Sequence, residues 1–377
     1  MGETVRRVLV INPGSTSTKV GIFRREGAEW TATIHHSDDE LQRFQGKPVL
    51  AQAAFRAGQI ADAFAGAGYK TKDFAAVAGR GGLLPPLQCG TYLVNDAMLS
   101  ELRAARRGEH ASNLGALLAR RFADAAGVPA FIVDPVTADE WQDCARLSGL
   151  PLIERSAIGH VLNIKAVARR YAREHERRYE DLNLIVVHLG SGITVSTHRG
   201  GRMIDQNTPE EGPFGPDRTG WLPVRQVIKL CFSGAYNEKQ LDRMVFGEGG
   251  LFAYLGTRDL KEVERRIEEG DSHARAVYDA MIYQIAKETG AMAAVLEGKV
   301  DALLLTGGMA HSEQLVRGLR NYVEWIAPVA VYPGEDELLA LAEGAFRVLE
   351  GEEEARAFAS PDQPHPQREA LVIRGLE

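Results

Sequence analysis

The stretch VLVINPGSTSTKVGIF, residues 8–23, joins two apolar runs through a short polar turn. The apolar runs predict two strands, Val8–Asn12 and Ser17–Arg24, and the Pro13-Gly14 pair predicts a tight turn between them. A third strand-like run, Trp30–Ile34, follows shortly afterwards. The sequence therefore predicts that the chain opens with a hairpin meander of three strands.

The turn of this first hairpin is a candidate anion site. The chain contains no GxxxxGK[ST] motif, so a P-loop is excluded. A tight hairpin can instead aim backbone N–H groups at an anion, and hydroxyl groups add uncharged donors. Gly14 allows the backbone to come close, while Ser15, Ser17 and Lys19 fall on one side by strand alternation. Asn12 can offer a carbonyl oxygen to a hydrated cation; an ordinary β-turn is the alternative interpretation.

The second half of the chain repeats the order of elements predicted in the first half. Strand-like runs at 182–192, 193–200 and 202–207 form a second predicted meander with tight Gly turns. Its first hairpin, VVHLGSGIT, resembles VINPGSTST of the first half. Strands and helices then follow in the same order in both halves. The predicted strands are Phe74–Gly79 and Pro129–Asp134 in the first half, and Asp301–Gly308 and 328–334 in the second. The predicted helices of the first half lie near Val49–Ala65, 95–105 and 112–127, and the last two have Asn or Ser caps. Those of the second half lie near Ser312–Trp325 and Asp336–Leu349. This internal repeat predicts two α/β domains with mostly parallel sheets, and a ligand site in the cleft between them.

Several other residues stand where chemistry is expected. Arg80 and Arg218 lie in Gly/Pro-rich loops, and their planar forks suit carboxylate and phosphate oxygens. Asp134 ends a predicted buried strand, a place where α/β sheets carry ligand sites. His110 precedes a predicted helix and His160 opens one, although a lone histidine is more often structural. The Thr-Gly-Gly turn at 306–308 lies between a strand and a helix start, and a helix start favours anions; a loop that needs glycine only for its geometry is the alternative interpretation.

Composition excludes several classes of function. The chain has 377 residues and a formal net charge of −7, which argues against a general nucleic-acid binder. Its three cysteines form no CxxC or Cys/His cluster, so neither a zinc site nor a disulfide framework is expected. No apolar run reaches the ~18 residues of a membrane span, and no signal peptide is seen. We therefore expect a cytoplasmic protein that contacts neither membrane nor nucleic acid.

Taken together, these residues resemble the acetate and butyrate kinase (acetokinase) family, and its butyrate kinases in particular. The N-[AS]-G-S-S-S-x-K pattern of acetate kinases reads NPGSTSTK at residues 12–19, and H-L-G-x-G reads HLGSG at 188–192. The Gly-Gly adenosine turn of the family is matched by TGGMAHS at 306–312. The match covers nearly the whole chain in order.

The resemblance implies an α/β fold of the two-domain, actin-like ATPase type, which is related to ribonuclease H. The expected architecture is a duplicated βββαβαβα unit with an interdomain cleft. We expect an N-terminal domain over residues 1–155 and a C-terminal nucleotide-binding domain over 156–339. The last segment, about 340–377, is expected to pack back on the N-terminal domain.

The resemblance also implies catalytic and substrate-binding roles. Arg80 and Arg218 would bind the acyl carboxylate and the transferring phosphoryl group, and His160 would stabilise the transition state. Asp134 would be the essential acidic residue near metal and substrate. His110 matches a further active-site histidine.

Nucleotide and metal contacts follow from the same resemblance. Mg²⁺ would be held by Asn12, Asp134 and Glu337, with Asp336 as the alternative to Glu337. The phosphates would lie along Ser15, Ser17 and Lys19. The nucleotide would be held by three further groups of residues, His188, Gly190, Ser191 and Gly192; Gly256, Thr257 and Arg258; and Thr306, Gly307, Gly308, Met309 and Ala310.

Departures from the acetate kinase pattern concern the acyl pocket. Acetate kinases continue H-R-V-V-H-G-G where this chain reads GRGGLLPP, so Gly81 and Gly82 replace bulkier residues that help to enclose a methyl group. Gly159 replaces an aromatic residue before the catalytic histidine, and Ile164 replaces a second histidine. These changes are similar to butyrate kinases and imply a roomier, more apolar pocket.

The expected reaction is reversible phosphoryl transfer from ATP, with Mg²⁺, to butyrate or a similar short or branched-chain fatty acid. The products are an acyl phosphate and ADP. The alternatives are an acetate or propionate kinase, another phosphotransferase of the same fold, and a non-catalytic ATP-dependent binding protein. A homo-oligomer, at least a dimer, is expected. The helices near 222–246 and 271–297 are candidate partner surfaces, but a core role is the stronger expectation for them.

Overall fold

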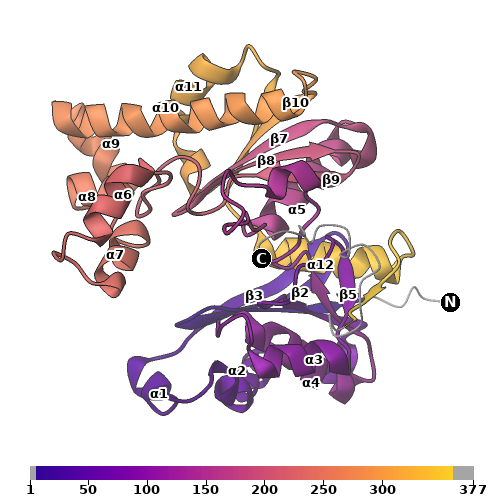
Figure 1. Cartoon of the computed structure of the whole chain (residues 1–377). Helices are drawn as coiled ribbons and strands as arrows, with labels where there is room; N and C mark the ends of the chain where they lie inside the picture. Colours follow the sequence, from indigo (N-terminus) through magenta and orange to yellow (C-terminus); the bar gives the residue numbers. More distant parts are fainter. Residues whose placement is uncertain (1–5, 360–377) are drawn as a thin grey trace, which may run out of the picture. The chain divides into compact units, whose positions relative to one another are not determined.

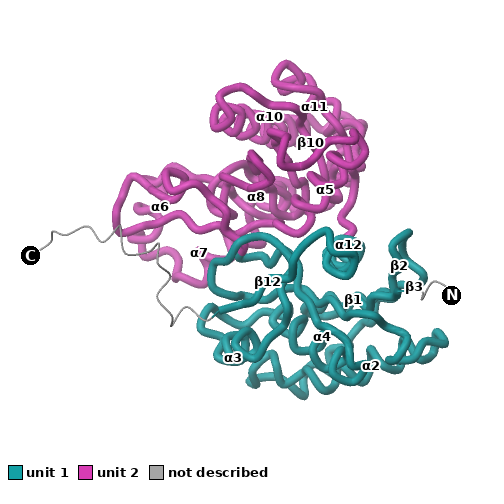
Figure 2. Tube along the Cα trace, turned by 90° about the vertical axis from the view of Figure 1, so that its right-hand side faces the viewer, with its two compact units in different colours: residues 1–137, 337–377 teal, residues 138–336 magenta. Residues whose placement is uncertain are grey.

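The computed structural model describes residues 6–359. The chain divides into two compact units, Met1–Thr137 with Glu337–Glu377, and Ala138–Asp336 (Figure 2). We call these unit 1 and unit 2. Residues 138–155, expected in the N-terminal domain, therefore group with unit 2, and 337–339 group with unit 1. The expected last segment belongs to unit 1 from residue 340 to 359; residues 360–377 lie outside the described part of the chain.

Unit 1 is built on a seven-stranded mixed sheet in the order β12-β5-β6-β4-β1-β2-β3. The predicted meander is present, because β1 pairs antiparallel with β2 and β2 pairs antiparallel with β3. Strands β4 and β6 continue the sheet in parallel from β1. The strands are β1 (Val8–Pro13), β2 (Ser17–Arg24), β3 (Gly27–His35), β4 (Ala76–Arg80), β5 (Thr91–Leu93), β6 (Ala130–Val133) and β12 (Arg356–Ala357).

Helices cover both faces of the unit 1 sheet (Figure 1). Helix α4 packs on β1, β4 and β6, and α12 packs on the same three strands from the opposite face. A Cβ at Gly344 of α12 would lie 2.4 Å from Val133 Cγ2, so this glycine permits close helix-to-sheet packing. The helices are α1 (Asp38–Gln42), α2 (Ala53–Gly66), α3 (Asp96–Ala104), α4 (Asn113–Ala126) and α12 (Glu337–Leu349).

Unit 2 repeats this arrangement on a five-stranded sheet in the order β11-β10-β7-β8-β9. Strands β7, β8 and β9 form an antiparallel meander, and β10 and β11 extend it in parallel from β7. The strands are β7 (Leu184–Leu189), β8 (Ile193–Arg199), β9 (Arg202–Gln206), β10 (Ala302–Gly307) and β11 (Val329–Pro333). The order matches β6-β4-β1-β2-β3 of unit 1, so the predicted duplication of an α/β unit is confirmed. The sheets are mixed, however, and not mostly parallel as predicted, because each opens with an antiparallel meander.

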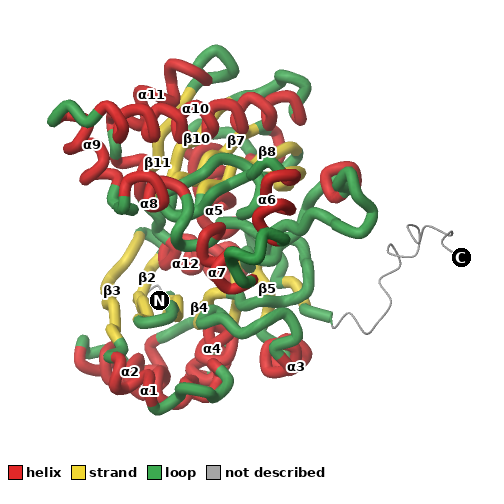
Figure 3. Tube along the Cα trace, turned by 60° about the vertical axis from the view of Figure 1, so that its left-hand side comes forward, coloured by secondary structure: helices red, strands yellow, loops and turns green. Residues whose placement is uncertain are grey.

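Figure 3 shows the helices of unit 2, which differ in how many buried residues they contain. Helix α5 packs on β7 and β10, and the long α10 packs on β7, β8 and β9. The helices are α5 (Val161–Glu174), α6 (Val224–Cys231), α7 (Glu238–Val245), α8 (Gly250–Leu255), α9 (Leu260–Glu268), α10 (Ser272–Val295) and α11 (Glu313–Val323). Helices α6 and α7 contain no buried residue, so the expected core role of 222–246 is wrong. Their apolar periodicity shows that each helix is amphipathic, with one apolar face, but periodicity does not say what covers that face.

Each unit has its own hydrophobic core. In unit 1 the core gathers Leu9 and Ile11 of β1 with Leu114 and Leu118 of α4. In unit 2 side chains of β7 and β10 pack against Met281 and other residues of α10. The central strands β1, β7 and β10 are buried along their whole length, which is typical of a sheet covered on both faces. Among residues 6–359, every helix is too short or too polar to cross a lipid bilayer.

Candidate active site

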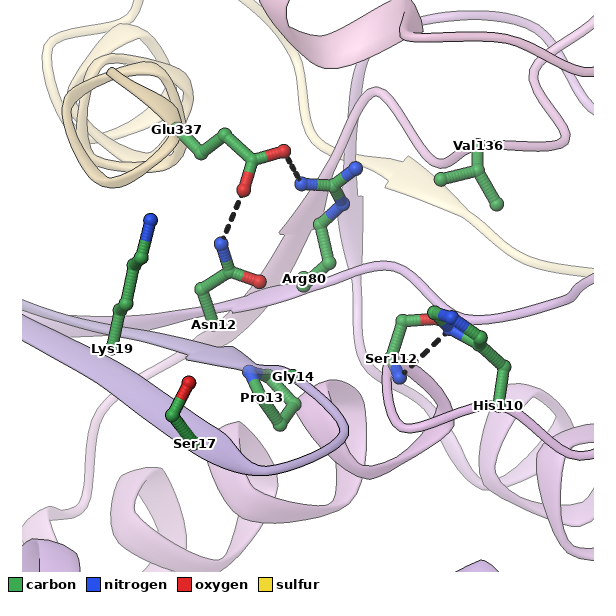
Figure 4. A pocket seen from close by; sticks show the side chains of 10 residues that line it. All are labelled: Asn12, Pro13, Gly14, Ser17, Lys19, Arg80, His110, Ser112, Val136 and Glu337. Atoms are coloured by element: carbon green, nitrogen blue, oxygen red, sulfur yellow. Dashed lines mark hydrogen bonds and ion pairs between the residues drawn. The ribbon is translucent and has the colours of Figure 1, made fainter. Parts of the chain in front are cut away.

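A pocket of about 280 Å³ opens in unit 1 where the turn of the first hairpin meets α12 (Figure 4). Its size suits a small ligand. Most of the lining was expected from the sequence, but Pro13, Ser112 and Val136 were not. The lining residues are Asn12, Pro13, Gly14, Ser17, Lys19, Arg80, His110, Ser112, Val136 and Glu337.

Asn12, Glu337 and Arg80 form a connected chain in this pocket (Figure 4). Asn12 Nδ2 donates to Glu337 Oε2 at 2.5 Å, and Arg80 Nη1 donates to Glu337 Oε1. The Glu337 side chain is 22% exposed and that of Arg80 is 13% exposed, so the ion pair is largely withdrawn from water. Within the described chain, Arg80 Nε is buried without a hydrogen-bond partner. Arg80 Nε can therefore still donate a hydrogen bond to an oxygen atom of a ligand.

His110 lies in the pocket with its ring held by Ser112 (Figure 4). The backbone N–H of Ser112 donates to His110 Nδ1 at 3.2 Å, and Ser112 Oγ lies 2.8 Å from the same nitrogen. Because Nδ1 accepts, the neutral ring carries its proton on Nε2. Burial, with the Arg80 charge as the smaller cause, lowers the pKa of His110. Ser112 was expected to cap α4, but its side chain forms no cap bond there, whereas Asn95 does cap α3 as expected.

Ser17 and Lys19 both line the pocket, as strand alternation predicts, but Ser15 does not. Ser15 is exposed at the tip of the turn, where strand alternation no longer applies. The turn closes with a bond from Gly14 N–H to Ser17 O at 2.7 Å. Buried Arg56 on α2 contacts the carbonyl groups of this turn, a contact that the sequence reasoning missed. An arginine in an Ala-rich helix gives no sequence signal that distinguishes it from a solvated one.

Asp134 follows β6 as predicted but does not line the pocket. It is 1% exposed, and its Oδ1 accepts the Gly90 N–H at 2.8 Å. Its φ of 37° lies in the left-handed region, which is unusual for a residue with a side chain. Strained backbone of this kind concentrates at functional sites because the surrounding structure must hold it in place.

The glycines that were expected to enlarge the acyl pocket are closely packed instead. A Cβ at Gly81 would lie 2.6 Å from Pro135 Cβ, and a Cβ at Gly82 would lie 2.6 Å from Asn113 Oδ1. In unit 2, a Cβ at Gly159 would lie 2.8 Å from both amide atoms of Gln206. The space beside these three glycines is therefore filled by neighbours, and they do not by themselves create room for a longer acyl chain.

In unit 2, His160 and His188 stack with ring centroids 3.8 Å apart. His160 precedes α5, and its Nδ1 lies 3.0 Å from Thr194 Oγ1. Asn163 Nδ2 donates to His188 Nδ1 at 3.0 Å and to Thr306 Oγ1 at 3.2 Å. Since Nδ1 of His188 accepts, its proton is on Nε2, which lies 3.1 Å from Glu335 Oε1. This network joins the second hairpin to the Thr-Gly-Gly turn at the end of β10.

Arg218 lies against the turn of the second hairpin. A Cβ at Gly192 would come within 2.4 Å of Arg218 Nη1, so a side chain here would displace the guanidinium from its present place. The guanidinium also lies 5.7 Å from the centre of the Phe246 ring. Gly190 and the exposed Ser191 complete the turn. The structure thus places Arg218 beside the 190–192 turn, within unit 2.

The remaining expected nucleotide residues lie on two loops of unit 2. Gly307, at φ 91°, ends β10, and a Cβ there would lie 2.4 Å from Leu189 O. Gly308, Met309 and Ala310 form the following 3₁₀ turn, in which the last two are buried. Gly256 ends α8 in the left-handed conformation, Thr257 Oγ1 accepts the Asp259 N–H, and Arg258 lies over Phe252 with 3.9 Å to the ring centre.

The fit of a magnesium ion can be judged from the oxygen atoms in the unit 1 pocket. Asn12 uses its nitrogen for Glu337, which leaves Oδ1 as an acceptor, and Glu337 supplies carboxylate oxygens. Mg²⁺ is commonly held by one or two protein oxygens together with water and phosphate, so this pair fits it. Asp336 is not among the lining residues, whereas Glu337 is. Within residues 6–359, no group of three or more His, Cys, Asp or Glu side chains is arranged to hold a metal.

Comparison with known proteins gives the relationship of the whole chain. Residues 158–327 match the model of the acetokinase family. The chain is 48% identical over 354 residues to probable butyrate kinases of Clostridium botulinum strains Alaska E43 (type E3) and Eklund 17B (type B), covering 93% of this chain and 99% of each relative.

Solved structures share the fold at lower identity. The acetate kinase of Porphyromonas gingivalis superposes with a TM-score of 0.77 at 18% identity, covering 91% of this chain and 100% of that chain. The acetate kinase of Entamoeba histolytica gives 0.70 at 15% identity, covering 91% and 100%. The propionate kinase of Francisella tularensis gives 0.67 at 17% identity, covering 90% and 98%. With the relatives at 48% identity, these findings show that the chain belongs to the acetokinase family.

Proposed function

We propose that the chain is an ATP-dependent carboxylate kinase that phosphorylates butyrate or a similar short or branched-chain fatty acid. The observation that carries this proposal is the 48% identity, over 93% of the chain, to relatives named probable butyrate kinases. The pocket with Arg80, His110 and Glu337 supports it, because it offers a carboxylate both a cation and a hydrogen-bond donor. The reaction is reversible and gives an acyl phosphate and ADP.

Phosphoryl transfer from ATP to a carboxylate requires neutralisation of negative charge and does not require a strong base. A fatty acid has a pKa near that of Asp or Glu, about 4, so it is already an anion at neutral pH. Its carboxylate oxygen attacks the γ-phosphorus of ATP, the bond to the β,γ-bridging oxygen breaks, and ADP leaves with the electron pair. Positioning and electrostatic stabilisation of the transferring phosphoryl group are therefore the main tasks of the protein.

In unit 1 we assign Arg80 to the acyl carboxylate and the transferring phosphoryl group, with His110 donating from Nε2. Ser17 and Lys19 donate to phosphate oxygens from the hairpin. Asn12 and Glu337 would hold Mg²⁺, which when bound neutralises phosphate charge. The ion pair between Arg80 and Glu337 must loosen for both roles to be filled. Asp134 is proposed as the acidic residue that orients the loops beside the pocket and the metal.

In unit 2 we assign His160 and Arg218 to the equatorial oxygens of the transition state. The second hairpin, with His188 and the 190–192 turn, would hold the nucleotide phosphates. The loops at 256–258 and 306–310 would hold the nucleoside. The Asn163 bonds that tie His188 to Thr306 support a common role for these residues.

The preference for a longer acyl chain is proposed from the relatives, not from open space beside glycines. Val136 lines the unit 1 pocket and stands apart from the polar chain of Asn12, Glu337 and Arg80, which leaves an apolar side to the pocket (Figure 4). We assign the acyl chain to this apolar side. An acetate or propionate kinase is the alternative within the same chemistry.

A cytoplasmic homo-oligomer, at least a dimer, is part of the proposal. Exposed apolar side chains gather on the segment 221–246, and such patches often mark an interface. The exposed fractions reach 70% at Val224 and 87% at Phe232. Sedimentation velocity of the purified chain tests this point; a monomer at micromolar concentration would contradict it.

A hydroxylamine trap tests the proposed reaction. Purified protein, MgATP, butyrate and hydroxylamine should give butyryl hydroxamate in step with ADP. Omitting ATP or butyrate should abolish the product. ADP released without hydroxamate would indicate an ATPase or a kinase for another acceptor, and no turnover at all would favour a non-catalytic nucleotide-binding protein.

A further inference from the structure

Arg56 is a buried arginine that lies behind the first hairpin. It belongs to α2 and is 1% exposed. Its Nη1 donates to Gly14 O at 2.7 Å and to Ser17 O at 3.2 Å, and its Nη2 donates to Ser15 O at 3.0 Å. A further bond joins Nη1 to Thr18 Oγ1 at 3.1 Å. One guanidinium thus binds three carbonyl groups and one hydroxyl group of a single turn.

The guanidinium is itself fixed from the helix side. Gln52 Oε1 accepts from Arg56 Nε at 3.0 Å and from Nη2 at 2.7 Å. Thr18 Oγ1 also lies 2.9 Å from Nε2 of the buried His36. Arg56 is therefore held in one orientation by Gln52, which directly precedes α2, and by β2, and the turn is held by Arg56.

This arrangement decides which backbone groups of the turn face the solvent side. The carbonyl groups of Gly14, Ser15 and Ser17 are directed to the guanidinium, and Thr16 O accepts the His36 N–H at 2.9 Å. Within the described chain, the N–H groups of Ser15 and Thr16 have no acceptor, and both residues are exposed. The two N–H groups are therefore available to donate to an anion at the tip of the turn, as the N–H groups of an anion-binding nest do.

Arg56 also carries a charge that the neighbouring side chains do not neutralise. Its hydrogen-bond acceptors are carbonyl, amide and hydroxyl oxygens, and among residues 6–359 it forms no ion pair. Burial lowers the pKa of Arg56 to about 10, so the group is still protonated at neutral pH. A buried cation without a carboxylate partner is costly, and here the cost is offset by hydrogen bonds to the turn and to Gln52.

We propose that Arg56 is the positioning residue of the first hairpin, holding its N–H groups toward a phosphate group and adding positive potential behind them. This inference rests on the proposed function, which places the transferring phosphoryl group at this hairpin. Arg56 touches no substrate; it acts through the turn at residues 14–17. The expected consequence is selective: binding of phosphate-bearing substrates depends on Arg56, and binding of the free carboxylate does not.

The test compares variants in both directions of the reaction. Arg56→Lys keeps the positive charge but cannot form hydrogen bonds to all the carbonyl groups of the turn. Arg56→Met removes both the charge and the hydrogen bonds. Gln52→Met leaves Arg56 in place and removes only its orientation, so it serves if the Arg56 variants fail to fold. Arg120→Lys is the matched control, because Arg120 on α4 also donates to a backbone carbonyl, Val94 O, away from the pocket.

We expect Arg56→Lys to raise KM for butyryl phosphate at least tenfold and to leave KM for butyrate within about twofold. Arg56→Met should show a larger rise, and Gln52→Met a rise of about threefold. Arg120→Lys should leave both constants unchanged. A purely structural role would lower the amount of active enzyme, and hence kcat, without separating the two KM values.

A second measurement does not depend on turnover. Inorganic phosphate added to ¹⁵N-labelled protein should shift the amide resonances of Ser15 and Thr16 in the wild type, and less in Gln52→Met and Arg56→Lys. If KM for butyryl phosphate is unchanged in Gln52→Met and in every folded Arg56 variant, the proposal is overturned. If the wild type makes no acyl phosphate, the proposed function fails, and the amide shifts alone then decide whether Arg56 positions the turn.

Discussion

The two hairpins occupy equivalent places in the two sheets but are supported in different ways. In unit 1, β1 and β2 pair Asn12 with Lys19 and Pro13 with Thr18 before the turn. In unit 2, β7 and β8 pair His188 with Thr194 and Leu189 with Ile193. Each first strand has a parallel neighbour on its other side, β4 or β10.

The supports differ in charge and in the use of glycine. The first turn is backed by the buried Arg56 cation and carries hydroxyl side chains. The second is tied through His188 to Asn163, and Gly192 leaves room for Arg218. The two hairpin turns can therefore present hydrogen-bond donors to an anion in different ways. In the first turn a buried arginine orients the backbone, and in the second a glycine leaves space for an arginine from another loop.

Replacing Arg80 in unit 1 or Arg218 in unit 2 should give the largest losses of activity. Arg80→Ala and Arg218→Ala should each lower kcat for butyryl hydroxamate formation by about 100-fold or more, because each would remove a cation that we propose for the transferring phosphoryl group. Arg120→Ala serves as the folded control. A loss below about tenfold (~1.4 kcal/mol) for either arginine would be too small for a transition-state role.

Adding one methyl group to each turn should separate the two kinds of support. Gly192→Ala would place a Cβ 2.4 Å from Arg218 Nη1, whereas Gly14→Ala would place one 3.3 Å from Ser17 O. We expect kcat/KM for butyrate phosphorylation to fall more than tenfold in Gly192→Ala and less than about threefold in Gly14→Ala. Equal losses in the two variants would contradict the claim that only the second turn depends on glycine for clearance.

Acid should destabilise both units through buried histidines. His36 lies behind the first hairpin, and His198 on β8 is 0% exposed between Tyr179 and Ser196. Burial lowers the pKa of both residues, with smaller contributions from Arg56 at His36 and from Lys165 and Arg169 at His198.

Because the folded pKa lies below that of the unfolded chain, the unfolded chain binds more protons below pH 6.5, and stability falls as the pH falls through that range. The free energy of unfolding from urea titrations should decline between pH 7 and 5. His198→Gln should flatten this decline more than His36→Gln, because His198 has the larger pKa shift. An unchanged slope in His198→Gln would refute this origin of acid sensitivity.

The smallest expected effect concerns His110. Replacing Arg80 by Met removes one of the two causes that lower the pKa of His110, so the pKa should rise. It should stay below 6.5, because burial is the larger cause and remains. A ¹H–¹³C NMR titration of the imidazole measures this shift. A fall in the pKa would show that Arg80 does not act on His110 by its charge.

The sequence predicted much of the fold because the local signals agree with the tertiary structure. The two meanders, the parallel strands after them and α12 follow from apolar runs and turn residues that the sheets actually bury. Strand β5 was missed because three residues are too few to show a periodicity. The exposure of α6 and α7 was missed because the apolar face of an amphipathic helix does not show what packs against it.

The lining of the unit 1 pocket was predictable where a sequence motif or a Gly/Pro-rich loop marks the residue, as for Asn12, Ser17, Lys19 and Arg80. Arg56 and Val136 were missed because each reaches the site only through tertiary contacts. The packing beside Gly81, Gly82 and Gly159 was misjudged for a related reason. A missing side chain predicts open space only if no neighbour moves in, and here Pro135, Asn113 and Gln206 do.

The measurement that tests the central claim most directly is kcat/KM for hydroxamate formation with acetate, propionate, butyrate and isobutyrate under the same conditions. A carboxylate kinase with its acyl chain on the side of the pocket lined by Val136 should use butyrate or isobutyrate at least tenfold better than acetate. A clear preference for acetate, or no acyl phosphate from any of the four acids, would contradict the account.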